Sequence, residues 1–218
     1  MALVGIDFSL NSPAACIFVD GAYEFISFFN YPKDSFKSPI KKAFLIHDEL
    51  MSTNRITGVM YKRDVANDDF REKELNKQKD ASDIATLIDT TLKDKYDISD
   101  FAIEGFSYGS KGNGFIDMIM YNTYLRQKLI SSYGLRSFYI FQPSAVKKLA
   151  GKGNCDKLYM VNAFKSNVLK DPILEQNPFW QWIQDKTYDP KKISKPVDDI
   201  VDSYFIVKCL EAKLNSND

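Results

Sequence analysis

The chain has 218 residues, close to the upper size of one compact domain and short of two typical ones. Hydrophobic residues make up 44% and charged residues 27%, so a sizeable core is possible and pervasive disorder is not expected. No apolar run reaches the roughly 18 residues that a membrane span needs, and the first residues lack the pattern of a secretory signal, so we expect a cytoplasmic protein with no membrane partner.

The first thirty residues predict three antiparallel strands. Apolar runs cover residues 3–8, 14–19 and 22–29. The second and third runs meet across Asp20-Gly21, a dipeptide that favours the positive φ values of a two-residue hairpin turn.

The middle of the chain is more polar. Residues 31–79 are charged and interrupted by two prolines, so we expect a solvated insertion, with a helix over residues 40–51. Ser82 can cap a helix whose apolar residues repeat at helical spacing as far as residue 95. A fourth strand is predicted over residues 101–106.

The second half of the chain alternates helices and strands. We expect a flexible glycine-rich loop, a long helix, a fifth strand, two further helices, a second insertion and an amphipathic closing helix. These elements cover residues 108–114, 115–132, 137–141, 144–149, 156–168, 171–196 and 197–213. The order βββαβαβα predicts one α/β domain over residues 1–218, with a mixed five-stranded sheet flanked by helices and insertions near 31–79 and 171–196.

The distribution of charge is uneven although the total is neutral. Twenty-nine basic residues balance 29 acidic ones, but residues 126–170 contain nine basic residues and a single acid, Asp156. That stretch therefore carries +8 and the remainder −8. A neutral total can conceal a polyanion-binding face beside an acidic site.

The cysteine and histidine content restricts metal chemistry. The three cysteines, Cys16, Cys155 and Cys209, lie far apart, and His47 is the only histidine. Neither a disulfide framework nor a Cys/His zinc site is expected from this set. Any metal ion would be bound by oxygen ligands.

Four carboxylates stand out by their positions. Asp7 and Glu104 interrupt apolar strands, where an unpaired buried charge costs several kcal/mol and therefore needs a cation or strong donors. Asp199 and Asp202 are three residues apart in the first turns of the closing helix, about 60° apart around its axis and about 4.5 Å along it. Each has a plain structural alternative, a strand-end acid in water or an acid favoured by the helix dipole.

The conjunction of these four acids favours a metal site. Four carboxylates from three elements would repel one another without a cation. Hard oxygen ligands suit Mg²⁺ or Mn²⁺, and two such ions roughly 4 Å apart activate water and stabilise the leaving oxygen of a phosphodiester. The predicted reaction is metal-dependent phosphoryl hydrolysis.

The motifs Gly5-Ile6-Asp7-Phe8-Ser9, Ile103-Glu104 and Asp199-x-x-Asp202, in this order, resemble those of RuvC-type Holliday-junction resolvases of the RNase H-like superfamily. The resemblance covers most of the chain outside the two insertions and is distant enough to suit a phage or other viral member. It implies an RNase H-like fold, two Mg²⁺ bound by the four acids, and paired nicks in four-way DNA junctions that leave 5′-phosphate and 3′-hydroxyl ends.

The resemblance also implies roles for basic and aromatic residues. Lys147 and Lys157 match the family's lysines that contact the scissile phosphate, which suits transition-state stabilisation. The loop after Glu104 matches the segment that reaches into the junction. The expected DNA contacts are Phe106, Tyr108, Lys111, Lys147, Lys148, Lys152 and Lys157. An ordinary solvated helix face is the alternative for the lysines, and a plain strand-to-helix connection capped by Asn113 is the alternative for the loop.

In that family the long helix after the loop forms a two-fold dimer interface, so residues 115–132 are expected to form the interface of a homodimer, although an apolar stripe is also typical of a core.

Two alternatives to the resolvase remain: a related nuclease acting on RNA or an RNA/DNA hybrid, and a junction-binding module without catalysis. The first motif also resembles a phosphate loop of actin-like ATPases, but the second phosphate loop and second domain of those enzymes do not fit in this chain.

Overall fold

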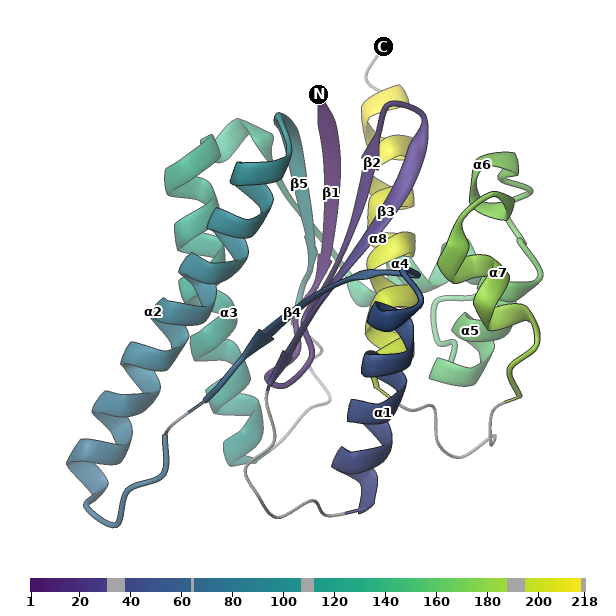
Figure 1. Ribbon diagram of the computed structural model, residues 1–218. Coiled ribbons are helices and arrows are strands. Elements are labelled where there is room, and N and C mark those ends of the chain that lie inside the picture. The colour runs from purple at the N-terminus through teal and green to yellow at the C-terminus, as the bar shows by residue number, and fades with distance from the viewer. Residues whose placement is uncertain (31–37, 64, 107–111, 188–194, 217–218) are drawn as a thin grey trace.

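The computed structural model describes residues 1–30, 38–63, 65–106, 112–187 and 195–216. Its centre is a mixed sheet with the strand order β4-β3-β2-β1-β5-β6 (Figure 1). The strands are β1 (Ala2–Asp7), β2 (Ala14–Val19), β3 (Ala22–Asn30), β4 (Thr57–Tyr61), β5 (Ile98–Glu104) and β6 (Phe138–Phe141). The three amino-terminal strands pair antiparallel as predicted, whereas β5 runs parallel to β1 and β6 parallel to β5.

The sheet has six strands in its described part, so the predicted count of five was wrong. The additional strand, β4, lies within the segment expected to be a solvated insertion and pairs parallel with β3. Helix α1 (Ser38–Ser52) makes the crossover between β3 and β4. A parallel strand of five residues inside a charged segment has too short an apolar pattern to be recognised from the sequence.

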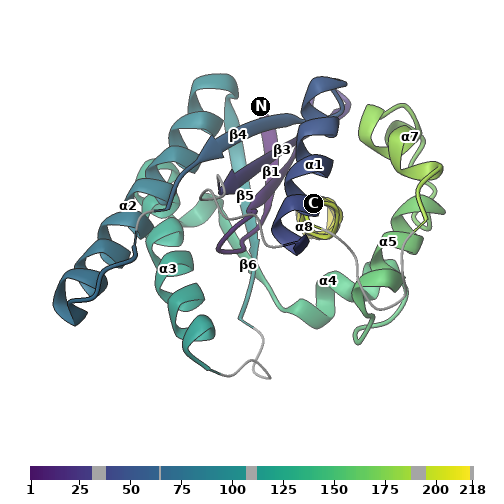
Figure 2. The ribbon, with the colours of Figure 1, turned by 60° about the horizontal axis from the view of Figure 1, so that its bottom comes forward.

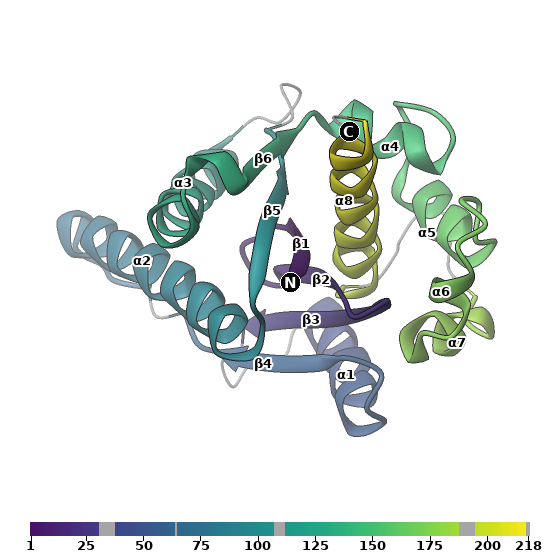
Figure 3. The same ribbon diagram turned by 90° about the horizontal axis from the view of Figure 1, so that it is seen from above.

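Helices cover both faces of the sheet, as Figure 3 shows from above. On one face lie α2 (Phe70–Lys95) and α3 (Asn113–Tyr133). On the other lie α1 and α8 (Val197–Asn215), with four shorter helices outside α8. These are α4 (Pro143–Ala150), α5 (Lys157–Lys165), α6 (Pro172–Glu175) and α7 (Pro178–Gln184). A separate hydrophobic core forms on each face of the sheet.

Helix α2 begins thirteen residues before the predicted start, so Ser82 lies inside the helix and does not cap it. Asp69 is the cap, because its side chain accepts a hydrogen bond from the backbone N–H of Glu72. A buried carboxylate, Asp80, then binds the Nε of Arg63 at 2.9 Å and the hydroxyl of Tyr121 at 2.6 Å. The hydrogen bond between Asp80 and Tyr121 holds the first turns of α2, which the sequence did not predict, against α3. Helix α3 likewise begins at Asn113, with Gly112 rather than Asn113 at its cap position.

Helix α8 was predicted as an amphipathic closing helix, and in the structure it is buried on most sides. Its buried residues run from Val197 to Leu210 and include Asp198, Asp199 and Ser203. The sheet lies on one side of α8, and α4 and α5 cover another (Figure 2). The acids at its amino end are therefore held in the interior and not in solvent.

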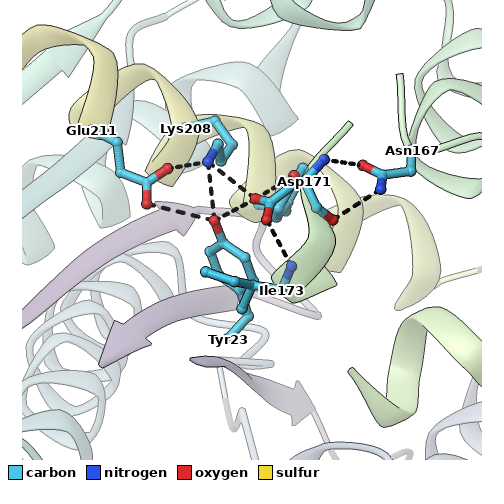
Figure 4. A network of polar contacts seen from close by, with 7 residues as sticks. Tyr23, Asn167, Asp171, Ile173, Lys208 and Glu211 are labelled. Atoms are coloured by element: carbon cyan, nitrogen blue, oxygen red, sulfur yellow. Dashed lines mark hydrogen bonds and ion pairs between the residues drawn. The ribbon is translucent and has the colours of Figure 1, made fainter. Parts of the chain in front are cut away.

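A polar network attaches the second expected insertion to the sheet and to α8 (Figure 4). The Asp171 carboxylate accepts hydrogen bonds from the hydroxyl of Tyr23 at 2.7 Å, the Nζ of Lys208 at 3.1 Å and the backbone N–H of Ile173 at 3.1 Å. Lys208 also forms an ion pair with Glu211. In the following helix α7 the aromatic residues pack inward, with the Phe179 ring 5.3 Å from that of Phe25.

None of the helices in the described part of the chain combines the length and apolarity needed to cross a bilayer.

Candidate active site

Asp7 and Glu104 end two neighbouring strands at the same edge of the sheet. The parallel register pairs Ile6 with Ile103, and each acid is the next residue of its strand. Because equivalent positions on parallel strands direct their side chains to the same face, both carboxylates point to one side of the sheet. Strands β1 and β5 are therefore neighbours that bring the two acids together.

Asp199 and Asp202 reach the same place from the first turns of α8. All four predicted carboxylates line one cavity of about 410 Å³ at the end of the sheet that is turned forward in Figure 2. The cavity is lined by Asp7, Phe8, Ser9, Glu104, Gly105, Phe106, Met118, Asn122, Lys147, Lys157, Met160, Lys195, Asp199 and Asp202. Segments almost 200 residues apart in the sequence thus form one acidic pocket.

Crowding and burial make these carboxyl groups hard to ionise. Burial raises the pKa of Asp7 well above its ordinary value, and the charges of Asp199 and Asp202 raise it further. Burial and the charge of Glu104 raise the pKa of Asp202 to about 7. The pKa of Glu104 is also raised, mainly by burial. Such a group of acids is stabilised by added positive charge.

Three lysines supply positive charge at this pocket. Lys147 and Lys157, both predicted from the sequence, line the cavity together with Lys195, which the sequence analysis did not single out. The ammonium of Lys195 forms ion pairs with Asp199 and, at 3.1 Å, with Asp198. Lys195 lies three and four residues before these acids, just ahead of the start of α8, and this short separation in the sequence was the available signal.

Asp198 differs from the other acids. Its side chain is 2% exposed, it does not line the cavity, and it forms ion pairs with both Lys157 and Lys195. Burial opposes its ionisation, but the two ammonium groups outweigh that effect and lower its pKa. Asp198 therefore holds the ammonium groups of Lys157 and Lys195 in place through ion pairs.

The donor set fits a hard divalent cation, although the described residues contain no group of three or more His, Cys, Asp or Glu side chains already arranged around one point. The carboxylates of Asp7, Glu104 and Asp202 form no hydrogen bond or ion pair with any residue in the described ranges, so their oxygens are free to act as ligands. Carboxylate oxygens are the ligands that Mg²⁺ and Mn²⁺ prefer. The residues present thus suit such an ion.

The expected DNA contacts separate into three groups. Phe106 lines the cavity, and the guanidinium of Arg126 lies 4.3 Å from the centre of its ring while donating a hydrogen bond to the Glu104 carbonyl. Lys148 and Lys152 are exposed outside the cavity. Tyr108 and Lys111 lie outside the described residues.

The chain thus has an α/β fold of the RNase H-like type, with acids at the carboxyl ends of two central strands and at the start of the last helix. No protein-family model matches the chain, and no curated protein matches it by sequence.

Among solved structures, the chain is similar to the yeast mitochondrial Holliday junction resolvase Ydc2, with a TM-score of 0.51 and 13% identity over 94% of this chain and 75% of that one. Thermus thermophilus RuvC gives a TM-score of 0.41 at 11% identity, covering 96% of both chains. The same bacterial protein in complex with a Holliday junction substrate gives 0.42 at 10%, covering 99% of this chain and 96% of that one. The resemblance predicted from the motifs is confirmed at the level of the fold.

Proposed function

We propose that this protein is a metal-dependent endonuclease that resolves four-way DNA junctions and related branched DNA. The proposal rests on one observation: Asp7, Glu104, Asp199 and Asp202 line a single cavity beside Lys147 and Lys157. A purely structural role would not account for four acids on one cavity wall, because each lowers the stability of its neighbours' ionised form.

In this proposal the four acids hold two Mg²⁺ ions, for which Mn²⁺ substitutes. Bound there, the ions supply an activated water and stabilise the leaving oxygen of the phosphodiester.

In this proposal Lys147 and Lys157 contact the scissile phosphate. Both line the cavity, Lys147 from helix α4 and Lys157 from helix α5, and each brings a positive charge to a pocket of negative groups. We assign them the stabilisation of negative charge that develops on the scissile phosphate. Lys157 is oriented for this by its ion pair with Asp198.

The choice of branched DNA follows from fold and motifs together, since the yeast protein of this fold is a Holliday junction resolvase. A homodimer would place two such sites on opposing strands of one junction. Helix α3 offers a surface for it, because Ile116 near its start is 65% exposed.

The test compares three end-labelled substrates, namely a four-way DNA junction, a linear duplex and an RNA/DNA hybrid, each with Mg²⁺ or Mn²⁺. We expect paired nicks in the junction only, with ends that ligase can seal. Asp7→Asn should lower cleavage by about a hundredfold or more while junction binding persists. Preferred cleavage of the hybrid would favour the RNase H-like alternative, and binding without any cleavage would favour the non-catalytic module.

A further inference from the structure

Asp199 is the one acid of the described cavity wall whose two carboxylate oxygens both have partners. Its Oδ1 is paired with the ammonium of Lys195. Its Oδ2 accepts hydrogen bonds from the hydroxyls of Ser12 at 2.5 Å and Ser9 at 3.2 Å. Hydroxyl donors can turn toward other acceptors, but an ammonium at the carboxylate excludes a second cation from the same oxygen by charge and by volume.

Lys195 has a second carboxylate within reach. Its Nζ lies 3.1 Å from the Oδ2 of Asp198, the same oxygen that pairs with Lys157. The other oxygen of Asp198, Oδ1, is buried and has no hydrogen-bond partner among the described residues. Lys195 can therefore leave Asp199 and remain paired, which keeps the displacement local.

We propose that Lys195 is a built-in counter-ion of the acidic pocket, which neutralises Asp199 in the metal-free protein and must move toward Asp198 before Asp199 binds a divalent cation. This inference rests on the metal site of the proposed function and adds its regulation. Lys195 is thus a positioning residue that opposes metal binding and keeps Asp199 in place until the ion arrives.

Lys195 pairs with only one of the acids that line the cavity. Three lining carboxylates, Asp7, Glu104 and Asp202, have no ion pair with a described residue, whereas Asp199 is paired with Lys195. Replacing an ammonium by a divalent ion adds one positive charge to a pocket in which acids outnumber lysines. The exchange is therefore electrostatically favourable once the ion is present.

The experiment measures Mn²⁺ binding to the full-length protein by isothermal titration calorimetry, without DNA. Lys195→Met should bind Mn²⁺ about tenfold more tightly than the wild type, and Lys195→Arg, which keeps the charge, should bind about as the wild type does. Lys147→Met is the matched control, since it removes a charge from the same wall but has no ion pair to Asp199 among the described residues. Its affinity should rise by about threefold or less.

The outcomes separate the two proposals. Equal gains in Lys195→Met and Lys147→Met would show a general charge effect and overturn the role of Lys195, while the metal site would stand. No Mn²⁺ binding by any of the variants or the wild type would overturn both proposals. Tighter binding in Lys195→Met alone supports the counter-ion.

A second measurement needs no variant. Amine acetylation of the wild-type protein followed by mass spectrometry should show Lys195 becoming several-fold more reactive when saturating Mn²⁺ is added, because its ammonium then keeps one carboxylate partner, Asp198, in place of two. Lys208, whose ion pairs with Asp171 and Glu211 lie in the network of Figure 4, should not change. Unchanged reactivity of Lys195 in metal-bound protein would overturn the proposed displacement.

Discussion

Gly5 of β1 lies directly against the backbone of α8 at Val207. A Cβ atom added at Gly5 would lie 2.6 Å from the amide nitrogen of Val207 and 2.7 Å from the carbonyl oxygen of Ser203. Strand β1 carries Asp7 and α8 carries Asp199 and Asp202, so this close approach of two backbones sets the distance between the acids. The glycine of the first motif thus serves the packing that assembles the site.

Gly5→Ala should consequently destabilise the protein, because the atoms that the methyl group meets are backbone atoms that cannot turn aside. We expect the free energy of unfolding to fall by about 1–3 kcal/mol, the usual range for overpacking a core, measured by urea denaturation. Gly114→Ala is the control, since a Cβ at Gly114 meets nothing within 4 Å. A loss in Gly114→Ala equal to that in Gly5→Ala would contradict this account.

The stability of the metal-free protein should depend on pH through Asp202. Its pKa is about 7 in the folded protein and 3.8 ordinarily, so between these values the folded state binds the proton more strongly than the unfolded chain. The free energy of unfolding should therefore decrease as the pH rises from about 4 to 7. Melting in chelator across this pH range should show a smaller decrease for Asp202→Asn than for the wild type, and an identical decrease would refute the assignment.

Asp171→Asn should lower stability without touching the acidic pocket. The substitution removes the charge that pairs with Lys208 and weakens the acceptor of the Tyr23 hydrogen bond (Figure 4). We expect a loss of about 1.5–3 kcal/mol, the range for hydrogen bonds to charged groups, measured by thermal or urea unfolding. Asp83→Asn, which breaks an exposed pair with Lys79, should give no measurable loss.

Lys147→Met should separate catalysis from binding. If Lys147 stabilises charge on the phosphate in the transition state, single-turnover cleavage of a four-way junction should slow by about 10²–10³-fold. Junction affinity should change by about threefold or less, because one of many phosphate contacts is lost. Lys148→Met removes the neighbouring exposed charge outside the cavity and should affect cleavage little. Similar slowing in both variants would show that Lys147 acts only through the overall positive charge of this region and not on the scissile phosphate.

Local patterns in the sequence determined much of the fold. The hairpin at Asp20-Gly21 and the strand over residues 14–19 follow from turn chemistry and a continuous apolar run, and β2 and β3 form there. Apolar strands interrupted by a single acid identified Asp7 and Glu104, since a charge at such a position is costly unless it has a function or a partner. These signals lie within a few residues and need no knowledge of the rest of the chain.

Only the tertiary structure decided the features that depend on distant segments. The pairing of β4 with β3, the burial of α8 beneath α4 and α5, and the hydrogen bond from Ser12 to Asp199 all join residues whose partners no local pattern specifies. The sequence by itself determined which residues carry unusual charge, because desolvation makes a lone acid in an apolar strand conspicuous. The fold decided which of those charges meet, because that depends on how the parallel strands and the buried last helix pack together.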